Sequence, residues 1–213
     1  MLKRKIEKQL MEWKKNPSKK PLIIKGCRQC GKTHSVLEFS HKNYQSVVYL
    51  NFFKILEYAQ IFEGPLDIDT ITMQIGATIP GTKFLPHKTV IILDEIQDAP
   101  NARTALKFFK EDGRYDVIGT GSLLGVQGYG KSPKSIPVGS ETVITMYPLD
   151  FEEFLWANDI QPPVFKKLRE CFEQVVPVPE ALHNRMHQLL LQYTVVGGMP
   201  EVVQEFVNTH QMD

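Results

Sequence analysis

An eight-residue stretch near the N-terminus has the residue types and spacing of a phosphate-binding loop. It matches the pattern G-x-x-x-x-G-K-S/T at every fixed position, and it follows an apolar run at residues 22–24. Its two glycines let the backbone turn tightly, so that successive N–H groups and the positive end of the next helix face an anion. The stretch therefore predicts a site for the phosphates of a nucleotide, formed by Gly26, Cys27, Arg28, Gln29, Cys30, Gly31, Lys32 and Thr33.

The last two residues of this loop, Lys32 and Thr33, are expected to contact different parts of the bound nucleotide and metal ion. Lys32 should reach the β- and γ-phosphates and serve catalysis, and the Thr33 hydroxyl supplies the hard oxygen ligand that Mg²⁺ requires. His34 follows directly in a predicted helix at 32–39, and we include it among the nucleotide-binding residues. The expected ligands are ATP and Mg²⁺.

A second candidate site lies in the middle of the chain. Residues 89–93 are continuously apolar or β-branched, which is typical of a strand buried on both faces, and Asp94 and Glu95 follow them. This is a Walker B pattern. We expect Asp94 to hold the Mg²⁺ shell through water or Thr33, and Glu95 to orient and deprotonate an attacking water.

A third candidate follows a short strand predicted at 116–119. A polar residue at the end of a strand between the two strands already described would reach the γ-phosphate or the attacking water. Thr120 or Ser122 fits this sensor position, and we choose Ser122 as the catalytic candidate. The alternative is that both residues only cap a turn.

The elements that must position these residues alternate between strands and helices, as in a parallel α/β sheet. An amphipathic helix at 2–15 comes first, and we expect its apolar stripe to pack on the core; that it borders the nucleotide base is an alternative compatible with this packing. Further strands are expected at 21–25, 46–52 and 141–146, and further helices at 69–78 and 102–110.

The signals become helical behind residue 148. Asp150 and Glu153 have the spacing of a capping box, and more helices are expected at 164–175, 179–194 and 200–208. We therefore expect an ATP-binding core with the N-terminal helix at 1–147 and a helical region at 148–213.

Composition limits the partners. The 213 residues carry 25 Lys and Arg against 24 Asp and Glu, so a net charge of +1 gives no support for DNA binding or for attraction to anionic membranes. Apolar stretches are far shorter than a membrane span, and the N-terminus does not resemble a signal peptide. With three cysteines and a nucleotide site, we expect a cytoplasmic protein. Either an unidentified protein partner or self-association is compatible with the sequence.

Other patterns have alternative interpretations. Cys27 and Cys30 form a C-x-x-C without a second pair for zinc, so they are expected to be small loop residues, with an oxidation-sensitive thiol as the alternative. The i, i+4 pair His183 and His187 is expected to be exposed on a helix. Arg103 and Arg114 are candidates for an arginine that completes a neighbouring site, but we expect each of them to form a surface ion pair instead. A glycine-rich stretch at 125–140 is expected to be a flexible connection rather than a partner contact.

Taken together, the motifs resemble one family. The set resembles the bacterial and archaeal AAA+ P-loop ATPases of the AAA_14 type, which usually carry a C-terminal DUF4143 domain. Besides the loop, the motifs that carry the resemblance are Ile92-Leu93-Asp94-Glu95-Ile96-Gln97, Gly121-Ser122-Leu123-Leu124-Gly125, Tyr147-Pro148-Leu149-Asp150-Phe151-Glu152-Glu153-Phe154 and Gly197-Gly198-Met199-Pro200-Glu201.

The resemblance implies an α/β fold with a five-stranded parallel sheet of order 5-1-4-3-2, helices on both faces and a small helical region behind it. It also implies ATP hydrolysis with Mg²⁺, served by Lys32, Thr33, Asp94, Glu95 and a sensor at Ser122. The chain ends at Asp213, before a DUF4143 domain, as either a short form or a truncation, so no function of that domain is carried over.

Two functions from different classes fit these features. The first is an ATPase that couples its nucleotide state to movement of the helical region and needs a partner or an oligomer for full activity. The alternative is a nucleotide-gated switch or adaptor with little turnover. Glu95 favours the first, because a pure switch has no need of a base beside the Mg²⁺ carboxylate.

Overall fold

A computed structural model describes residues 2–122 and 139–211 of the chain. Within these residues the chain forms two compact units. One runs from Ile6 to Met146, and the other combines the N-terminal residues up to Lys5 with the chain from Tyr147 onward. Most of the glycine-rich stretch expected to be a flexible connection lies outside the described residues.

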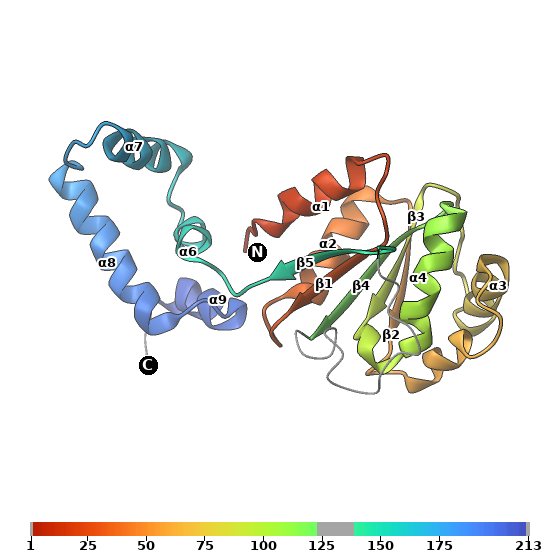
Figure 1. The fold of residues 1–213 in the computed structure, drawn as a ribbon. Coiled ribbons are helices and arrows are strands. Elements are labelled where there is room, and N and C mark those ends of the chain that lie inside the picture. Colours follow the sequence, from red (N-terminus) through yellow and green to blue (C-terminus); the bar gives the residue numbers. More distant parts are fainter. Residues whose placement is uncertain (1, 123–138, 212–213) are drawn as a thin grey trace. The chain divides into compact units, whose positions relative to one another are not determined.

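The larger unit is built on a five-stranded parallel sheet (Figure 1). Its strands are β1 (Leu22–Gly26), β2 (Ser46–Asn51), β3 (Thr89–Asp94), β4 (Asp116–Ser122) and β5 (Thr142–Met146). Their spatial order is β2-β3-β4-β1-β5. The predicted order 5-1-4-3-2 is therefore confirmed, and β4 lies between β1 and β3 as the sensor argument required.

Strand β4 is longer than predicted. It continues through Ser122 instead of ending at Gly119. The reason is its parallel ladder with β1, in which Thr120 pairs with Ile24 and Ser122 with Gly26. Thr120 and Ser122 are therefore strand residues, and the interpretation of Thr120 as a cap of a turn is wrong. The residues that follow Ser122 lie outside the described part of the chain, so for Ser122 the two interpretations stay predictions.

Helices cover both faces of the sheet (Figure 1). One face packs against α1 (Ile6–Lys15) and α2 (Lys32–Asn43) through alternate strand residues such as Ile24 and Ile92. The other packs against α3 (Ile68–Thr78), α4 (Pro100–Asp112) and the 3₁₀ helix η1 (Leu56–Phe62) through the intervening residues, such as Ile23 and Ile91. Because strand side chains alternate between faces and both faces are covered, β1 and β3 contain continuous apolar runs, at residues 22–24 and 90–93.

The smaller unit is helical. It contains α6 (Phe151–Ala157), α7 (Pro162–Glu173), α8 (Glu180–Val196) and α9 (Pro200–Thr209) around a core that includes Leu149, Phe154 and Leu189. The predicted capping box is confirmed, since Asp150 accepts from the Glu153 N–H at 2.9 Å and Glu153 accepts from the Asp150 N–H at 3.1 Å.

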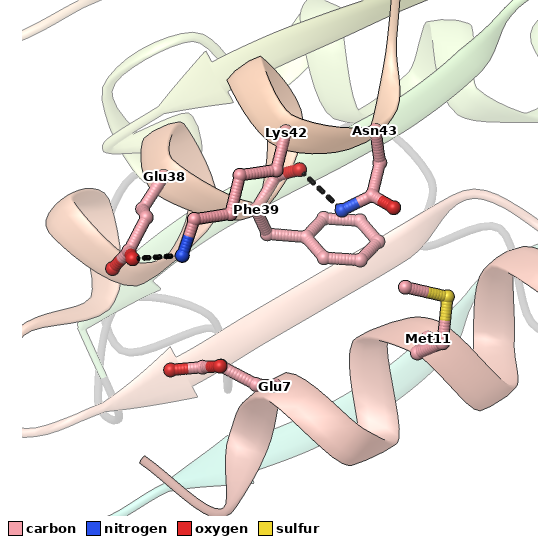
Figure 2. A pocket seen from close by; sticks show the side chains of 6 residues that line it. All are labelled: Glu7, Met11, Glu38, Phe39, Lys42 and Asn43. Atoms are coloured by element: carbon pink, nitrogen blue, oxygen red, sulfur yellow. Dashed lines mark hydrogen bonds and ion pairs between the residues drawn. The ribbon is translucent and has the colours of Figure 1, made fainter. Parts of the chain in front are cut away.

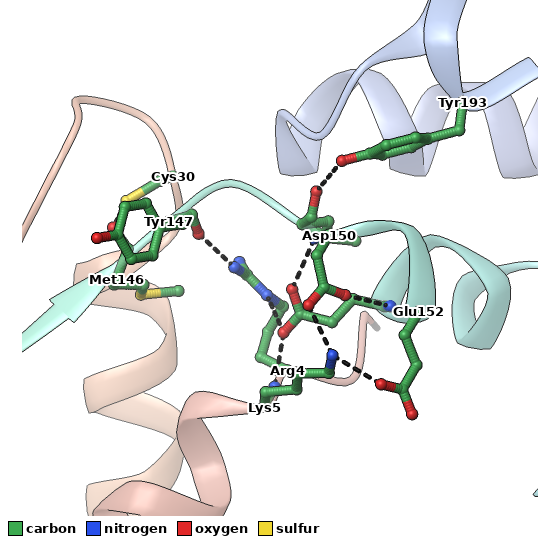
Figure 3. A network of polar contacts seen from close by, with 10 residues as sticks. Arg4, Lys5, Cys30, Met146, Tyr147, Asp150, Glu152 and Tyr193 are labelled. Atoms are coloured by element: carbon green, nitrogen blue, oxygen red, sulfur yellow. Dashed lines mark hydrogen bonds and ion pairs between the residues drawn. The ribbon is translucent and has the colours of Figure 1, made fainter. Parts of the chain in front are cut away.

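The first predicted helix begins later than its periodicity indicates. Helix α1 begins at Ile6, not at Leu2, and residues before it belong to the helical unit. Leu2 packs with the core of that unit, and Arg4 and Lys5 bind its polar groups, as Figure 3 shows for Lys5 with Asp150 and Glu152. Across the residues that the structure describes, the helices are too short or too polar to cross a membrane.

Candidate functional site

The loop between β1 and α2 has a tight backbone. Gln29 and Gly31 have positive φ angles of 62° and 94°, so the loop reverses direction before α2 starts. At Gly26 a Cβ atom would lie 2.2 Å from the backbone oxygen of Met146, on the neighbouring strand β5. The first glycine of the motif is thus required by close packing against β5.

The Lys32 side chain lies inside this loop. It is buried, and its Nζ donates to the backbone oxygens of Gly26 at 3.1 Å and Cys27 at 2.7 Å. A buried ammonium group needs such acceptors. The same geometry places its positive charge at the N-terminus of α2, where backbone N–H groups and the helix dipole favour an anion.

The Asp94 carboxylate connects the loop to the end of β3. It is 2 % exposed and accepts hydrogen bonds from donors on three other elements. Thr33 Oγ1, at the start of α2, donates to Oδ1 at 2.9 Å, and the Thr120 hydroxyl of β4 donates to the same oxygen. Tyr49 OH and Asn51 Nδ2, both on β2, donate to Oδ2 at 2.6 Å each. The structure thus brings the predicted metal ligands Thr33 and Asp94 into contact.

Tyr49 and Asn51 are not among the site residues predicted from the sequence. Both lie on β2, two positions apart and therefore on one face of the sheet. In the parallel register Asn51 is the direct neighbour of Asp94. Burial and the hydrogen bond to Asp94 raise the pKa of Tyr49 to about 12, so its hydroxyl remains a hydrogen-bond donor even at pH values where a free tyrosine ionises. The sequence signal that could have identified them is the spacing of two polar side chains, two positions apart in an otherwise apolar strand.

Glu95 follows Asp94 in a left-handed backbone conformation, with φ of 55°. Its N–H donates to Thr120 Oγ1 at 3.4 Å, and its carboxylate accepts a hydrogen bond of 2.6 Å from the Gln97 side chain. It is half-buried. The residue is thus held by two neighbours, while its role as a base stays a prediction.

The two sensor candidates occupy different places on β4. Thr120 is fully buried and contacts Asp94 directly. Ser122 is half-buried and pairs with Gly26 in the β1 register, beside the start of the loop. Contact with the carboxylate therefore favours Thr120, and position beside the loop favours Ser122.

The remaining predicted residues differ in exposure. Cys27, Arg28, Gln29 and His34 are exposed, and Cys30 is buried with its Sγ 3.7 Å from the Met146 oxygen. His183 and His187 are exposed on α8, as expected, with ring centroids 6.4 Å apart.

The two candidate arginines differ. Arg114 is partly exposed and pairs with Asp112 and Asp69, as expected. Arg103 is buried, and its guanidinium lies 2.7 Å from Glu141, so the expectation of a surface pair is wrong for this residue. Helix α4 holds Arg103 against the segment that enters β5, which accounts for its burial.

A shallow cavity of about 150 Å³ lies between α1 and the C-terminal half of α2 (Figure 2). Its lining includes Glu7, Met11, Glu38 and Phe39. The loop 26–33 adjoins the opposite end of α2, so this cavity is separate from the cluster around Asp94. Helix α1 buries its stripe in the core through Ile6, Leu10 and Trp13, in agreement with the core-packing alternative.

Comparisons with known proteins find one family model and several similar folds. Residues 18–155 match the model AAA_14, described as an AAA domain. The Walker-type ATPase PABY2304 of Pyrococcus abyssi aligns with 100% of this chain and 69% of its own, at 15% identity and a TM-score of 0.51. AMPPCP-bound DnaA from Aquifex aeolicus aligns with 94% of this chain and 58% of its own, at 12% identity and a TM-score of 0.50. No curated protein sequence matches the chain.

Proposed function

Because the chain belongs to the AAA_14 family of AAA domains, we propose that it binds ATP with Mg²⁺ at the loop 26–33 and hydrolyses it. The observation that carries the proposal is the 2.9 Å hydrogen bond from Thr33 to Asp94. It joins the end of a phosphate-binding loop to a buried carboxylate on a strand far away in sequence. A hydroxyl and a carboxylate in contact are the hard oxygen donors that Mg²⁺ prefers.

The phosphates are bound by the loop. Backbone N–H groups of residues 27–33 and the N-terminus of α2 face the anion, and Lys32 moves its ammonium group from the loop oxygens to the β- and γ-phosphates. Thr33 and Asp94 hold the cation. When bound, Mg²⁺ neutralises the charge that develops on the phosphate oxygens.

Hydrolysis requires a base for water. Glu95 takes this role, because it follows Asp94 at the carboxyl end of β3 and is half-buried. Ser122, with Thr120 as the alternative, orients the attacking water or the γ-phosphate. Fixed donors of this kind contribute by being in place before the reaction.

The use of the nucleotide is a further part of the proposal. We infer that the nucleotide state is coupled to movement of the helical region, and that a protein partner or self-association completes the site, in the cytoplasm. The alternative is a nucleotide-gated switch or adaptor with little turnover. The presence of Glu95 beside Asp94 supports the hydrolytic function over this alternative.

ATP turnover of the wild type and of Glu95→Gln tests the proposal. A general base contributes about 10²-fold or more, so Glu95→Gln should lower kcat by at least that factor and leave the Kd for ATP within about twofold. Glu111→Gln, which removes an exposed carboxylate on α4, is the matched control and should keep wild-type turnover. Each assay is run with and without DNA, beside a measurement of oligomeric state.

The outcomes separate the alternatives. If the wild type and Glu95→Gln bind ATP equally and neither turns it over under any condition, hydrolysis fails and the switch function remains. Equal turnover in both would remove Glu95 as the base.

A further inference from the structure

Two side chains of the edge strand β2 fix one oxygen of the Asp94 carboxylate. Tyr49 OH and Asn51 Nδ2 each lie 2.6 Å from Oδ2, and Asn51 Nδ2 lies 3.0 Å from Tyr49 OH. Oδ1 is bound instead by the hydroxyls of Thr33 and Thr120. The two side chains of β2 thus bind Oδ2, and the two threonine hydroxyls bind Oδ1.

The Asn51 amide has only one orientation that satisfies its neighbours. Its Oδ1 accepts the backbone N–H of Lys54 at 2.7 Å, so its NH₂ group must face Asp94. Asn51 is 8 % exposed and Asp94 is 2 % exposed, so little water competes for these bonds. The turn after β2 therefore locks the amide, and the amide in turn holds the carboxylate.

This division of donors has a consequence for a cation. A hydroxyl that donates its proton to Oδ1 keeps its lone pairs for a metal. Rotation of the carboxylate about its Cβ–Cγ bond would break both bonds to β2. As long as these bonds persist, Oδ1 keeps facing the hydroxyl of Thr33.

We propose that Tyr49 and Asn51 are positioning residues that hold Asp94 in the orientation needed to bind Mg²⁺ together with Thr33. The inference rests on the proposed function, in which Thr33 and Asp94 hold the cation. Partners of this kind orient metal ligands, and their loss commonly lowers metal affinity by about 10- to 100-fold.

The test is the Mg²⁺ enhancement of nucleotide binding. This is the Kd for a fluorescent, non-hydrolysable ATP analogue in EDTA divided by its Kd in excess Mg²⁺. Tyr49→Phe removes one hydroxyl, and Asn51→Ala removes the amide. In each variant the enhancement should fall about tenfold, whereas the Kd in EDTA should stay within about twofold of the wild type, because the loop that binds the phosphates is unchanged.

Tyr44→Phe is the matched control. Tyr44 OH also donates to a carboxylate, Asp116 Oδ2, at 2.7 Å, but Asp116 begins β4 and therefore lies at the opposite end of the parallel strands from the loop. The control should lose a comparable amount of stability in urea and keep the wild-type enhancement. A merely structural role of Tyr49 would make the two tyrosine variants alike.

A second measurement does not depend on the folding of Asn51→Ala. In the Asp94→Asn background, Tyr49→Phe should cause no further fall in enhancement, because the carboxylate that it positions is gone.

The possible failures are distinguishable. Wild-type enhancement in folded Tyr49→Phe would overturn the positioning role and leave the proposed function intact. The same fall in Tyr44→Phe would also overturn it. If the wild type binds the ATP analogue with the same Kd in EDTA and in excess Mg²⁺, both the Mg²⁺ part of the proposed function and this inference are refuted.

Discussion

At the scale of single residues, Tyr44 links the N-terminal half of the sheet unit to β4. Its hydroxyl donates to Asp116 at 2.7 Å, and its ring packs edge-on against Phe39 at 6.2 Å. Burial, reinforced by the hydrogen bond to Asp116, raises the pKa of Tyr44 far above its ordinary value. The side chain therefore stays protonated in the folded protein at pH values where a free tyrosine ionises.

The hydrogen bond of Tyr44 makes the stability of the protein depend on alkaline pH. Its contribution, about 1–2 kcal/mol, is fully present below pH 10 and is lost above it, because tyrosine in the unfolded chain ionises first. The stability advantage of the wild type over Tyr44→Phe should narrow by about 1.4 kcal/mol per pH unit above 10. Urea unfolding of both proteins between pH 8 and about 11 measures this difference. A constant difference across that range would mean that Tyr44 ionises normally.

Residues of the candidate site were predictable to different degrees. Thr33 and Asp94 stand at fixed positions of motifs, so their side chains could be assigned a task before their contact was known. Tyr49 and Asn51 belong to no motif. Their role depends on the register that makes Asn51 the neighbour of Asp94, and register is set by packing of the sheet rather than by a local pattern.

At the scale of elements, a buried ion pair joins α4 to the segment before β5. Arg103 and Glu141 side chains are each 9 % exposed, with Nη2 and Oε1 2.7 Å apart. Their charges satisfy one another where water is largely excluded. The pair therefore fixes where α4 lies relative to the edge strand of the sheet.

Replacement of one partner of this pair should lower the free energy of unfolding strongly, whereas replacement of both partners should lower it little. Arg103→Met leaves a buried carboxylate without its cation and should lower the free energy of unfolding by about 3–5 kcal/mol. The double variant Arg103→Met/Glu141→Leu should recover most of that loss, since apolar side chains can replace a buried pair. Chemical unfolding of the three proteins measures this. A single-variant loss below about 1 kcal/mol would indicate that water reaches the pair.

Strands were predicted better than their ends. A continuous apolar run such as residues 89–93 predicts a buried strand, whereas strand order came from the family resemblance and not from periodicity. The prediction ends strand β4 at Gly119, because Thr120, Gly121 and Ser122 are typical turn residues. The ladder with β1 overrides that preference.

At the scale of the whole molecule, the N-terminus belongs to the helical unit. Glu153 is 5 % exposed and accepts from Arg4 Nε at 3.2 Å, from the Lys5 N–H at 2.6 Å and from the Asp150 N–H at 3.1 Å. Arg4 also donates to the Tyr147 oxygen at 2.7 Å. The apolar periodicity predicts that α1 begins at Leu2, because no local sequence signal marks Lys5 as the last residue of the N-terminal segment that belongs to the helical unit.

These contacts allow a test of the proposed division into a core and a helical region. Arg4→Met removes the cation beside Glu153 but leaves its two backbone donors, so α6 should lose about 1–3 kcal/mol of local stability. Amide hydrogens of residues 151–157 should then exchange about 5- to 150-fold faster, whereas those of β3 and β4 should keep their wild-type rates. Hydrogen exchange followed by mass spectrometry measures both regions in one sample. Lys8→Met, on the exposed face of α1, is the control and should change neither. Equal acceleration in α6 and in β3 would show that the two units unfold together, because local opening confined to one unit cannot expose the strands of the other.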